Sequence, residues 1–186
     1  MHRISKLSLT IATVGIAAIA LVGCSTAGSP ATPTPGSTVA VNAPAAAPAE
    51  ASFKDNVLTT KDVVIKITDV KTIQVGEKGN EYGKKPVIAF WYDTTNVSGK
   101  NTDPMTEWLF LFQAYQDNDP NAENKLRAGS LPDAAFRESQ MSKIKQGGTV
   151  SNAIAYELSD TTTPVKLVAS TRLGLHEVGS MTIELT

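Results

Sequence analysis

The sequence predicts an all-β fold, a β-sandwich of about seven strands with one short helix. Three observations predict it. Residues 53–186 contain several β-branched or aromatic runs of strand length, turn-forming residues separate these runs, and only one stretch has the pattern of a helix. These 134 residues are enough for one domain with its own hydrophobic core.

Residues 1–23 have the features of an export signal. The first six residues include Arg3 and Lys6 and no acidic residue, and the stretch that follows is uncharged and rich in Leu, Ile, Val and Ala. This apolar stretch is short for a transmembrane helix, and its basic flank is typical of a signal peptide. We therefore expect residues 1–23 to be removed on export.

The signal ends in Leu21-Val22-Gly23-Cys24, around the only cysteine in the chain. This sequence resembles the lipobox of bacterial lipoproteins, in which the cysteine receives a thioether-linked diacylglycerol and becomes the new N-terminus. The resemblance implies that Cys24 is lipidated and anchors the chain on the outer face of the bacterial cytoplasmic membrane. The alternative is an ordinary secreted protein with an incidental cysteine near its cleavage site.

Residues 24–52 are expected to form a disordered linker after the lipidated cysteine. Ser25 to Ser52 is almost wholly Ala, Pro, Ser, Thr and Gly, which cannot bury enough apolar surface to offset the entropy of ordering. These 28 residues would span roughly 90 Å if fully extended. The linker would hold the domain of residues 53–186 away from the membrane.

The mature chain is mildly acidic. Removal of residues 1–23 leaves 15 Lys and Arg against 18 Asp and Glu, a formal net charge of −3. Such a chain lacks the basic surface that nucleic-acid binding needs, so no nucleic-acid partner is expected. No disulfide is available once Cys24 is lipidated, so the domain depends on its core for stability.

Two long strands are predicted first. The run VVIKITDVKTIQV (63–75) is β-branched throughout, and the change of apolar parity around Val70 indicates a β-bulge near Asp69. The run PVIAFWYDTTNVS (86–98) is apolar on both parities in its first half, which indicates a central strand covered on both faces. An amphipathic helix fits this β-branched and aromatic content less well.

The rest of the domain is predicted as further strands with one helix. EWLFLFQAYQ (107–116) is ambiguous, and the shared parity of its aromatic residues favours a strand over a helix. TVSNAIAYEL (149–158), PVKLVAS (164–170) and SMTIELT (180–186) alternate as strands do. Only PDAAFRESQMSKIKQGG (132–148) is predicted to be helical, with Asp133 as its cap, a loose apolar stripe of Phe136, Met141 and Ile144, and Gly147 as its end.

The predicted core takes one or two inward-facing residues from each main strand. These residues are Ile65, Ile67, Ile88, Phe90, Ile154, Tyr156, Leu167 and Ile183.

Three stretches together resemble a known group of domains: PVIAFWYDTTNVSGK, IKQGGTVSNAIAYELSD and PVKLVA. They look like a family of uncharacterised Gram-positive lipoprotein domains, similar to a wider immunoglobulin-like group that includes a secreted mycobacterial immunoprotective antigen. The resemblance covers roughly residues 53–186 and implies an immunoglobulin-like sandwich. It implies no activity and no functional residues.

The sequence contains no clear catalytic or metal-binding motif. His176 is the only histidine of the mature chain, and no G-x-S-x-G motif accompanies it. Oxygen-bearing side chains alternate between Asp117 and Glu123 as in a calcium loop, but Ala122 and Ala128 stand where that loop needs Gly and Glu. We therefore expect no metal, no cofactor and no catalytic residue.

The remaining candidates are aromatic side chains. Such residues at strand spacing usually belong to the core, but an open strand face would display two or three of them as a patch for a protein, peptide or glycan. The candidate patch comprises Trp91, Tyr92, Trp108 and Tyr115.

The sequence thus predicts a surface lipoprotein that presents a non-enzymatic, immunoglobulin-like binding or scaffolding domain to an unknown envelope protein, peptide or glycan. One alternative is an accessory or regulatory subunit that docks on another envelope protein. A carboxylate-based glycan hydrolase is a further alternative, and it would need two acids about 5 to 9.5 Å apart in a cleft.

Overall fold

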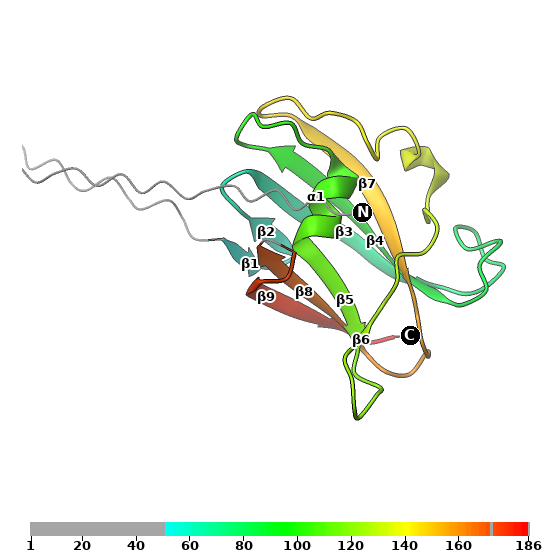
Figure 1. Cartoon of the computed structure of the whole chain (residues 1–186). Coiled ribbons are helices and arrows are strands. Elements are labelled where there is room, and N and C mark those ends of the chain that lie inside the picture. The colour runs from blue at the N-terminus through cyan, green and yellow to red at the C-terminus, as the bar shows by residue number, and fades with distance from the viewer. Residues whose placement is uncertain (1–50, 172, 186) are drawn as a thin grey trace, which may run out of the picture. The chain divides into compact units, whose positions relative to one another are not determined.

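The computed structural model describes residues 51–171 and 173–185, which form two antiparallel sheets packed face to face (Figure 1). The first sheet contains, in spatial order, β1 (Ser52–Lys54), β2 (Val57–Thr59), β3 (Val63–Ile73), β4 (Val87–Asn96) and β7 (Thr149–Glu157). The second sheet contains β6 (Asn124–Lys125), β5 (Phe112–Gln116), β8 (Val165–Thr171) and β9 (His176–Ile183). The predicted all-β sandwich with one short α-helix is confirmed. The predicted signal peptide (1–23), Cys24 and nearly all of the linker (24–52) lie outside the described residues.

The predicted bulge in β3 is confirmed. The pairing of β3 with β4 shifts register between Ile67 and Asp69. Before the shift, Ile65 and Ile67 face the core between the sheets, and after it Ile73 faces the opposite side of the sheet. The extra residue therefore lets one strand serve two apolar layers.

β4 is an inner strand of its sheet, paired with β3 and β7, and its first half is buried on both faces, as predicted. Ile88 and Phe90 face the core between the sheets, whereas Val87 and Ala89 join a smaller apolar cluster on the outer face. Residues 126–148, called the covering segment below, begin along the edge of β7 and shield part of this outer face. The N–H of Gly129 donates to the carbonyl of Ala155 at 2.8 Å, close to Val87.

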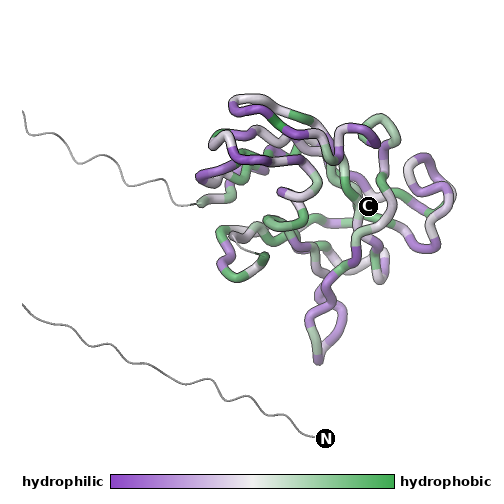
Figure 2. Tube along the Cα trace, turned by 45° about the horizontal axis from the view of Figure 1, so that its top comes forward, coloured by the Kyte–Doolittle hydropathy of each residue, from purple (hydrophilic) through white to green (hydrophobic). Residues whose placement is uncertain are grey.

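The core lies between the two sheets, and the hydrophilic stretches gather in the loops (Figure 2). Of the eight predicted core residues, seven are buried, and Ile183 is partly buried and packs against the others. The core prediction is therefore confirmed.

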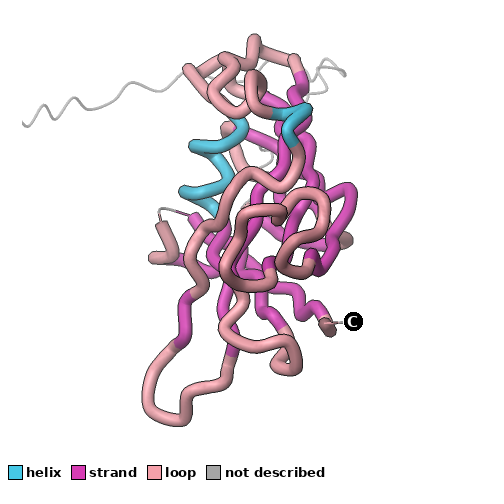
Figure 3. Tube along the Cα trace, turned by 90° about the vertical axis from the view of Figure 1, so that its right-hand side faces the viewer, coloured by secondary structure: helices cyan, strands magenta, loops and turns pink. Residues whose placement is uncertain are grey.

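The predicted strand over residues 107–116 is wrong in its first half. Residues Pro104–Leu111 form the helix α1, which leads directly into β5 (Figure 3). The side chain of Asp103 accepts a hydrogen bond from the N–H of Thr106 at 2.9 Å, and Pro104 occupies the first turn. Helical spacing turns Trp108 inward and leaves Phe110 exposed, whereas a strand would have placed both on one face.

The predicted helix over residues 132–148 is also wrong. Only the 3₁₀ turn η1 (Ala134–Phe136) forms, and Asp133 caps it by accepting from the N–H of Ala135 at 3.0 Å. The apolar residues of this stretch are five and three positions apart, so on a helix they would spread over an arc of about 140° and form only a loose stripe. Ile144 is buried, while Met141 is exposed.

The short strands β1, β2 and β6 have no counterpart in the sequence prediction, and β9 begins at His176 rather than at residue 180. The three short strands contain only two or three residues each, too few for an alternating pattern to be visible.

Candidate functional site

The predicted aromatic patch does not form. Tyr92 and Trp108 are 1% and 0% exposed and belong to the core. Trp91 and Tyr115 are partly exposed, but they lie on the outer faces of different sheets. The prediction failed for Tyr92 because aromatic content does not show which face of β4 lies against the other sheet. It failed for Trp108 because aromatic content does not show that residues 104–111 form a helix.

Trp108 and Tyr92 hold the core together instead. The ring centroids of Trp108 lie 4.3 Å from Tyr92 and 4.4 Å from Phe112, and its indole N–H donates to the hydroxyl of Tyr156 at 2.9 Å. The hydroxyl of Tyr92 donates to the carbonyl of Pro104 at 3.2 Å. Burial raises the pKa of Tyr156 to about 12 and also raises the pKa of Tyr92, so both phenols stay neutral in the core.

Trp91 is committed to the outer face of the first sheet. Its indole N–H donates to the carboxylate of Asp133 at 3.3 Å, and the ammonium of Lys71 lies 5.3 Å from its ring centre. It packs against the apolar cluster of Ile73, Val87, Ala89 and Ala155. Trp91 therefore attaches the covering segment to the sheet.

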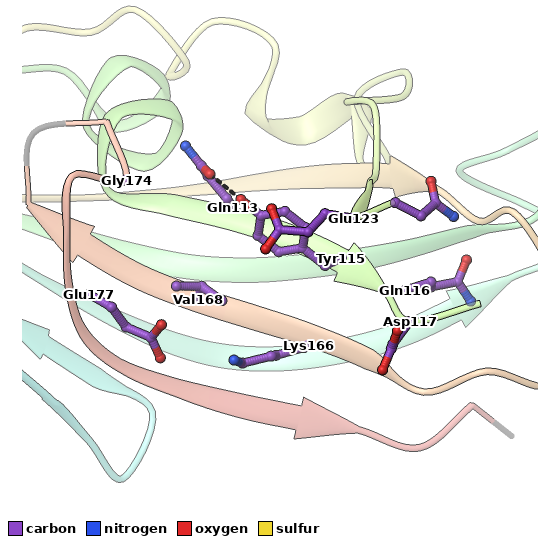
Figure 4. Close-up of a pocket in the computed structure, with 10 residues that line it drawn as sticks. Gln113, Tyr115, Gln116, Asp117, Glu123, Lys166, Val168, Gly174 and Glu177 are labelled. Carbon is purple, nitrogen blue, oxygen red and sulfur yellow. Dashed lines mark hydrogen bonds between the residues drawn. The ribbon is translucent and has the colours of Figure 1, made fainter. Parts of the chain in front are cut away.

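Tyr115 lies in a groove on the outer face of the second sheet (Figure 4). Strand alternation turns Phe112 and Ala114 inward, which leaves Gln113 and Tyr115 facing outward. The pairing of β5 with β8 sets Tyr115 opposite Lys166 and Gln113 opposite Val168. The groove has a volume of about 440 Å³, and its lining also includes Asp117, Glu123, Asn124, Gly174 and Glu177.

The groove is polar and mainly acidic. The hydroxyl of Tyr115 donates to the side-chain oxygen of Gln113. Burial raises the pKa of Tyr115, and the nearby carboxylates of Glu123 and Glu177 raise it further, so the phenol keeps its proton. Lys166 is the one cationic side chain among the groove-lining residues.

A buried hydrogen-bond network supports one end of the groove. The amide oxygen of Gln116 accepts from the N–H of Ser159 at 2.7 Å, and its NH₂ group donates to the carbonyls of Asp160 and Thr163 at 3.0 and 2.8 Å. Gln116 is 0% exposed, and these bonds fix the β7–β8 turn beside β5. The hydrogen bonds of Gln116 therefore hold the β7–β8 turn in place at this end of the groove.

The β5–β6 loop, which resembled a calcium loop in sequence, borders the same end. The carboxylate of Asp119 accepts from the N–H of Asn121 at 2.8 Å, so it stabilises its own turn. Across residues 51–171 and 173–185, no three His, Cys, Asp or Glu side chains lie close enough together to hold a metal ion. His176 is exposed at the start of β9.

Sequence reasoning missed Gln113, Lys166 and Glu177 as possible ligand-binding residues. The alternation of polar and apolar residues within β5 and β8 could have indicated that their polar side chains share an open face. Their grouping depends on the pairing of strands about 50 residues apart, which the sequence does not state.

The described part of the chain is thus a single β-sandwich domain with a polar groove on one outer sheet face, and no helix within it is long and apolar enough to cross a membrane. Residues 40–171 match the family model described as "Domain of unknown function (DUF5067)", so the chain belongs to this family. The fold is similar to a solved structure of "a putative lipoprotein from Staphylococcus aureus subsp. aureus NCTC 8325". That similarity has a TM-score of 0.62 and 23% sequence identity, and it covers 73% of this chain and 92% of the other. No curated protein matches the chain.

Proposed function

We propose that this chain is a non-enzymatic, lipid-anchored module that binds a saccharide of the cell envelope in the groove of the second sheet. The anchor is the lipidated Cys24 of the sequence Leu21-Val22-Gly23-Cys24, on the outer face of the cytoplasmic membrane. The fold similarity to a protein named as a putative lipoprotein supports this placement.

The observation that carries the proposal is the composition of the groove. A saccharide presents many hydroxyl groups around an apolar ring face, so its site needs several polar partners beside an aromatic surface. The groove sets the ring of Tyr115 among the side chains of Gln113, Asn124 and Lys166, on the three neighbouring strands β5, β6 and β8. Rigid strands hold these groups in place, which lowers the entropy lost on binding.

The negative charge of the groove favours some classes of saccharide over others. Among the lining residues, Asp117, Glu123 and Glu177 contribute three carboxylates against one cation, Lys166, and Lys125 is paired with Tyr115 at the edge of the sheet. Phosphate-rich or otherwise polyanionic polymers would be repelled, whereas neutral and amino sugars would not. We therefore expect neutral saccharides, such as oligomers of N-acetylglucosamine, to bind better than anionic wall polymers.

Isothermal titration of the mature chain with N-acetylglucosamine oligomers tests the proposal. Tyr115→Ala should weaken binding about 10-fold or more, since the loss of one aromatic contact costs about 1.4 kcal/mol. Tyr82→Ala is the matched control because Tyr82 is 98% exposed on the β3–β4 loop, outside the groove. Saccharide binding that Tyr115→Ala leaves unchanged would reject the groove as the site.

The same titrations test the non-enzymatic assignment. A glycan hydrolase also uses a pair of carboxyl groups, and the groove contains three. Such an enzyme would cleave the oligomer during the experiment. Chromatography of the recovered ligand should show it intact. Shortened products that Glu123→Gln or Glu177→Gln abolishes would establish the hydrolase instead.

A further inference from the structure

The exposed apolar side chains of the domain are concentrated at one end. Among the described residues, eight large hydrophobic side chains are exposed, and four of them belong to α1 and to the β8–β9 turn. Phe110, Leu173 and Leu175 are 47%, 57% and 74% exposed, and the N–H of Leu173 donates to the carbonyl of Phe110 at 3.2 Å. We call these three residues the apolar tip.

The backbone conformation of the β8–β9 turn is energetically unfavourable. Leu173 has a φ of 58°, in the left-handed region that Gly or Asn adopts more readily than a large residue does. Gly174 follows with a φ of 88°, and the turn lies against Gln113. A leucine held outward in a strained turn lowers stability without contributing to the core, which points to a role outside the domain.

The apolar tip lies at the end of the sandwich where the chain enters the domain. Strand pairing aligns Ser52 with Thr59 and Thr59 with Val64, so Ser52 lies at the end of the first sheet where β3 begins. Figure 1 shows the β8–β9 turn and α1 at this same end, with the C-terminus and the β3–β4 loop at the other. The ring centroids of Phe53 and Phe112 are 5.5 Å apart, which ties β1 to the residue directly after α1.

We infer that the apolar tip inserts into the outer surface of the membrane that carries the lipid anchor. This inference rests on the proposed lipidation of Cys24, because the 27 residues between the anchor and β1 keep the tip within reach of the bilayer. One or two exposed leucines give only weak membrane affinity by themselves. A tether converts such a weak contact into an intramolecular one at high effective concentration, so here it suffices to orient the domain.

Insertion would also set the position of the groove. Gly174 belongs both to the turn that carries the tip and to the groove lining, and the β5–β6 loop borders the far end of the groove. If the tip is inserted, the groove therefore runs away from the membrane surface, with Gly174 at the near end and the β5–β6 loop at the far end. A mobile saccharide chain of the wall could then enter it from the side.

A fluorescent probe at the tip tests the inference directly. The lipidated full chain has no free thiol, because its only cysteine is Cys24, so Leu175→Cys gives one labelling site for a polarity-sensitive dye. The labelled protein is reconstituted in vesicles of phosphatidylglycerol and phosphatidylethanolamine. The matched control carries Tyr82→Cys, on the β3–β4 loop at the opposite end.

The dye at position 175 should show a blue shift and should be quenched by lipids with a nitroxide on the acyl chain. The dye at position 82 should show neither effect. Adding Leu173→Ser should lower the docked-to-free ratio of the tip roughly 10- to 100-fold, because it removes one leucine from the apolar contact. The spectrum at position 175 should then return toward that of the dye in water.

Three results would overturn the inference. Equal quenching at positions 175 and 82, or none at either, would show that the tip has no preference for the bilayer. A blue shift without nitroxide quenching would mean that the tip contacts a protein, including a second copy of the chain. A chain that fails to float with the vesicles and takes up dye at Cys24 has no anchor, which overturns the proposed function as well.

Discussion

The outer faces of the two sheets differ in what covers them. On the first sheet, Val87 and Ala89 are 3% and 0% exposed because the covering segment and its neighbours pack near this face. On the second sheet, Tyr115 and Lys166 line an open groove. The outer face of the first sheet is therefore partly covered, whereas the outer face of the second sheet is open.

The two faces follow from different sequence patterns. β4 is apolar on both parities in its first half, and such a strand must be covered twice to keep its apolar surface from water. β5 and β8 alternate, with Ala114 and Leu167 inward and Tyr115 and Lys166 outward, so one face of each strand can stay wet. The open face of the second sheet can therefore offer a site to a ligand without any movement of the covering segment.

The largest effect is expected in the core that both sheets share. Phe90 is fully buried, with its ring centroid 5.5 Å from that of Trp108 and 6.1 Å from that of Tyr156. Phe90→Ala should lower the free energy of unfolding by roughly 3 to 5 kcal/mol, measured by urea denaturation. A loss below about 1 kcal/mol would mean that this side chain faces solvent and would invert the face assignment of β4.

The attachment of the covering segment can be broken by one methyl group. A Cβ on Gly79 would lie 2.3 Å from the carbonyl oxygen of Pro132, whereas a Cβ on Gly76 would meet nothing within 4 Å. Both glycines have positive φ angles, of 94° and 85°, so replacement by Ala imposes similar backbone strain at each. Gly79→Ala should therefore destabilise the domain by about 1 to 3 kcal/mol more than Gly76→Ala.

Limited proteolysis would locate that change. Gly79→Ala should expose new cleavage sites near residues 130–137, where the β3–β4 loop and the covering segment meet. Equal stability and equal cleavage patterns for the two variants would show that the segment does not depend on this contact.

Matched aromatic truncations sharpen the difference between the faces. Trp91→Ala removes the hydrogen bond to Asp133 and the packing on the outer apolar cluster, and it should cost about 2 kcal/mol. Tyr115→Ala, on the open face, should cost about 1 kcal/mol or less. Thermal and urea denaturation of the two variants would measure the difference, and a larger cost for Tyr115→Ala would contradict the description of its face as open.

The sequence allowed most of the long strands of the two sheets to be predicted, but it did not lead to a prediction of α1. Alternation and β-branching identify β3, β4, β7 and β8, because those patterns are set by burial on a sheet. The signal for α1 was also present, since Asp103 followed by Pro104 is a favourable N-cap and first helical residue. The prediction over residues 107–116 did not use this signal and rested on aromatic parity, although helical spacing explains Trp108 and Leu111 equally well.

The candidate site could be predicted only in part. Tyr115 was identified, but its partners come from β8, β9 and the β5–β6 loop, and strand register alone decides that Lys166 lies beside it. The cover over the first sheet depends on where a long loop returns, which no local pattern in residues 126–148 indicates. For these reasons Trp91 and Tyr115 looked equivalent in sequence, although one is partly covered and the other lines a groove.

The smallest expected effect concerns the ion pair that ties the covering segment to α1. The carboxylate of Asp103 is nearly buried and lies 2.9 Å from the ammonium of Lys143, which is 58% exposed. Burial would raise the pKa of Asp103, but the N–H of Thr106 and the ammonium of Lys143 outweigh it and hold the pKa below the ordinary value. Because the folded-state pKa is depressed, the carboxylate stabilises the fold fully above its unfolded pKa of about 3.9, and this contribution is lost as the pH falls through the folded value.

Asp103→Asn isolates this charge, because Asn caps a helix about as well as Asp does. The variant should be less stable than the original by about 0.5 kcal/mol at neutral pH, a value reduced by the exposure of Lys143. The difference should shrink towards zero well below pH 4, where the native carboxyl group takes up its proton. Urea denaturation of both proteins across this range would measure it. If the difference stays constant down to the lowest pH, the charge of Asp103 contributes nothing, and the cover is held by the contacts of Gly79, Trp91 and Ile144.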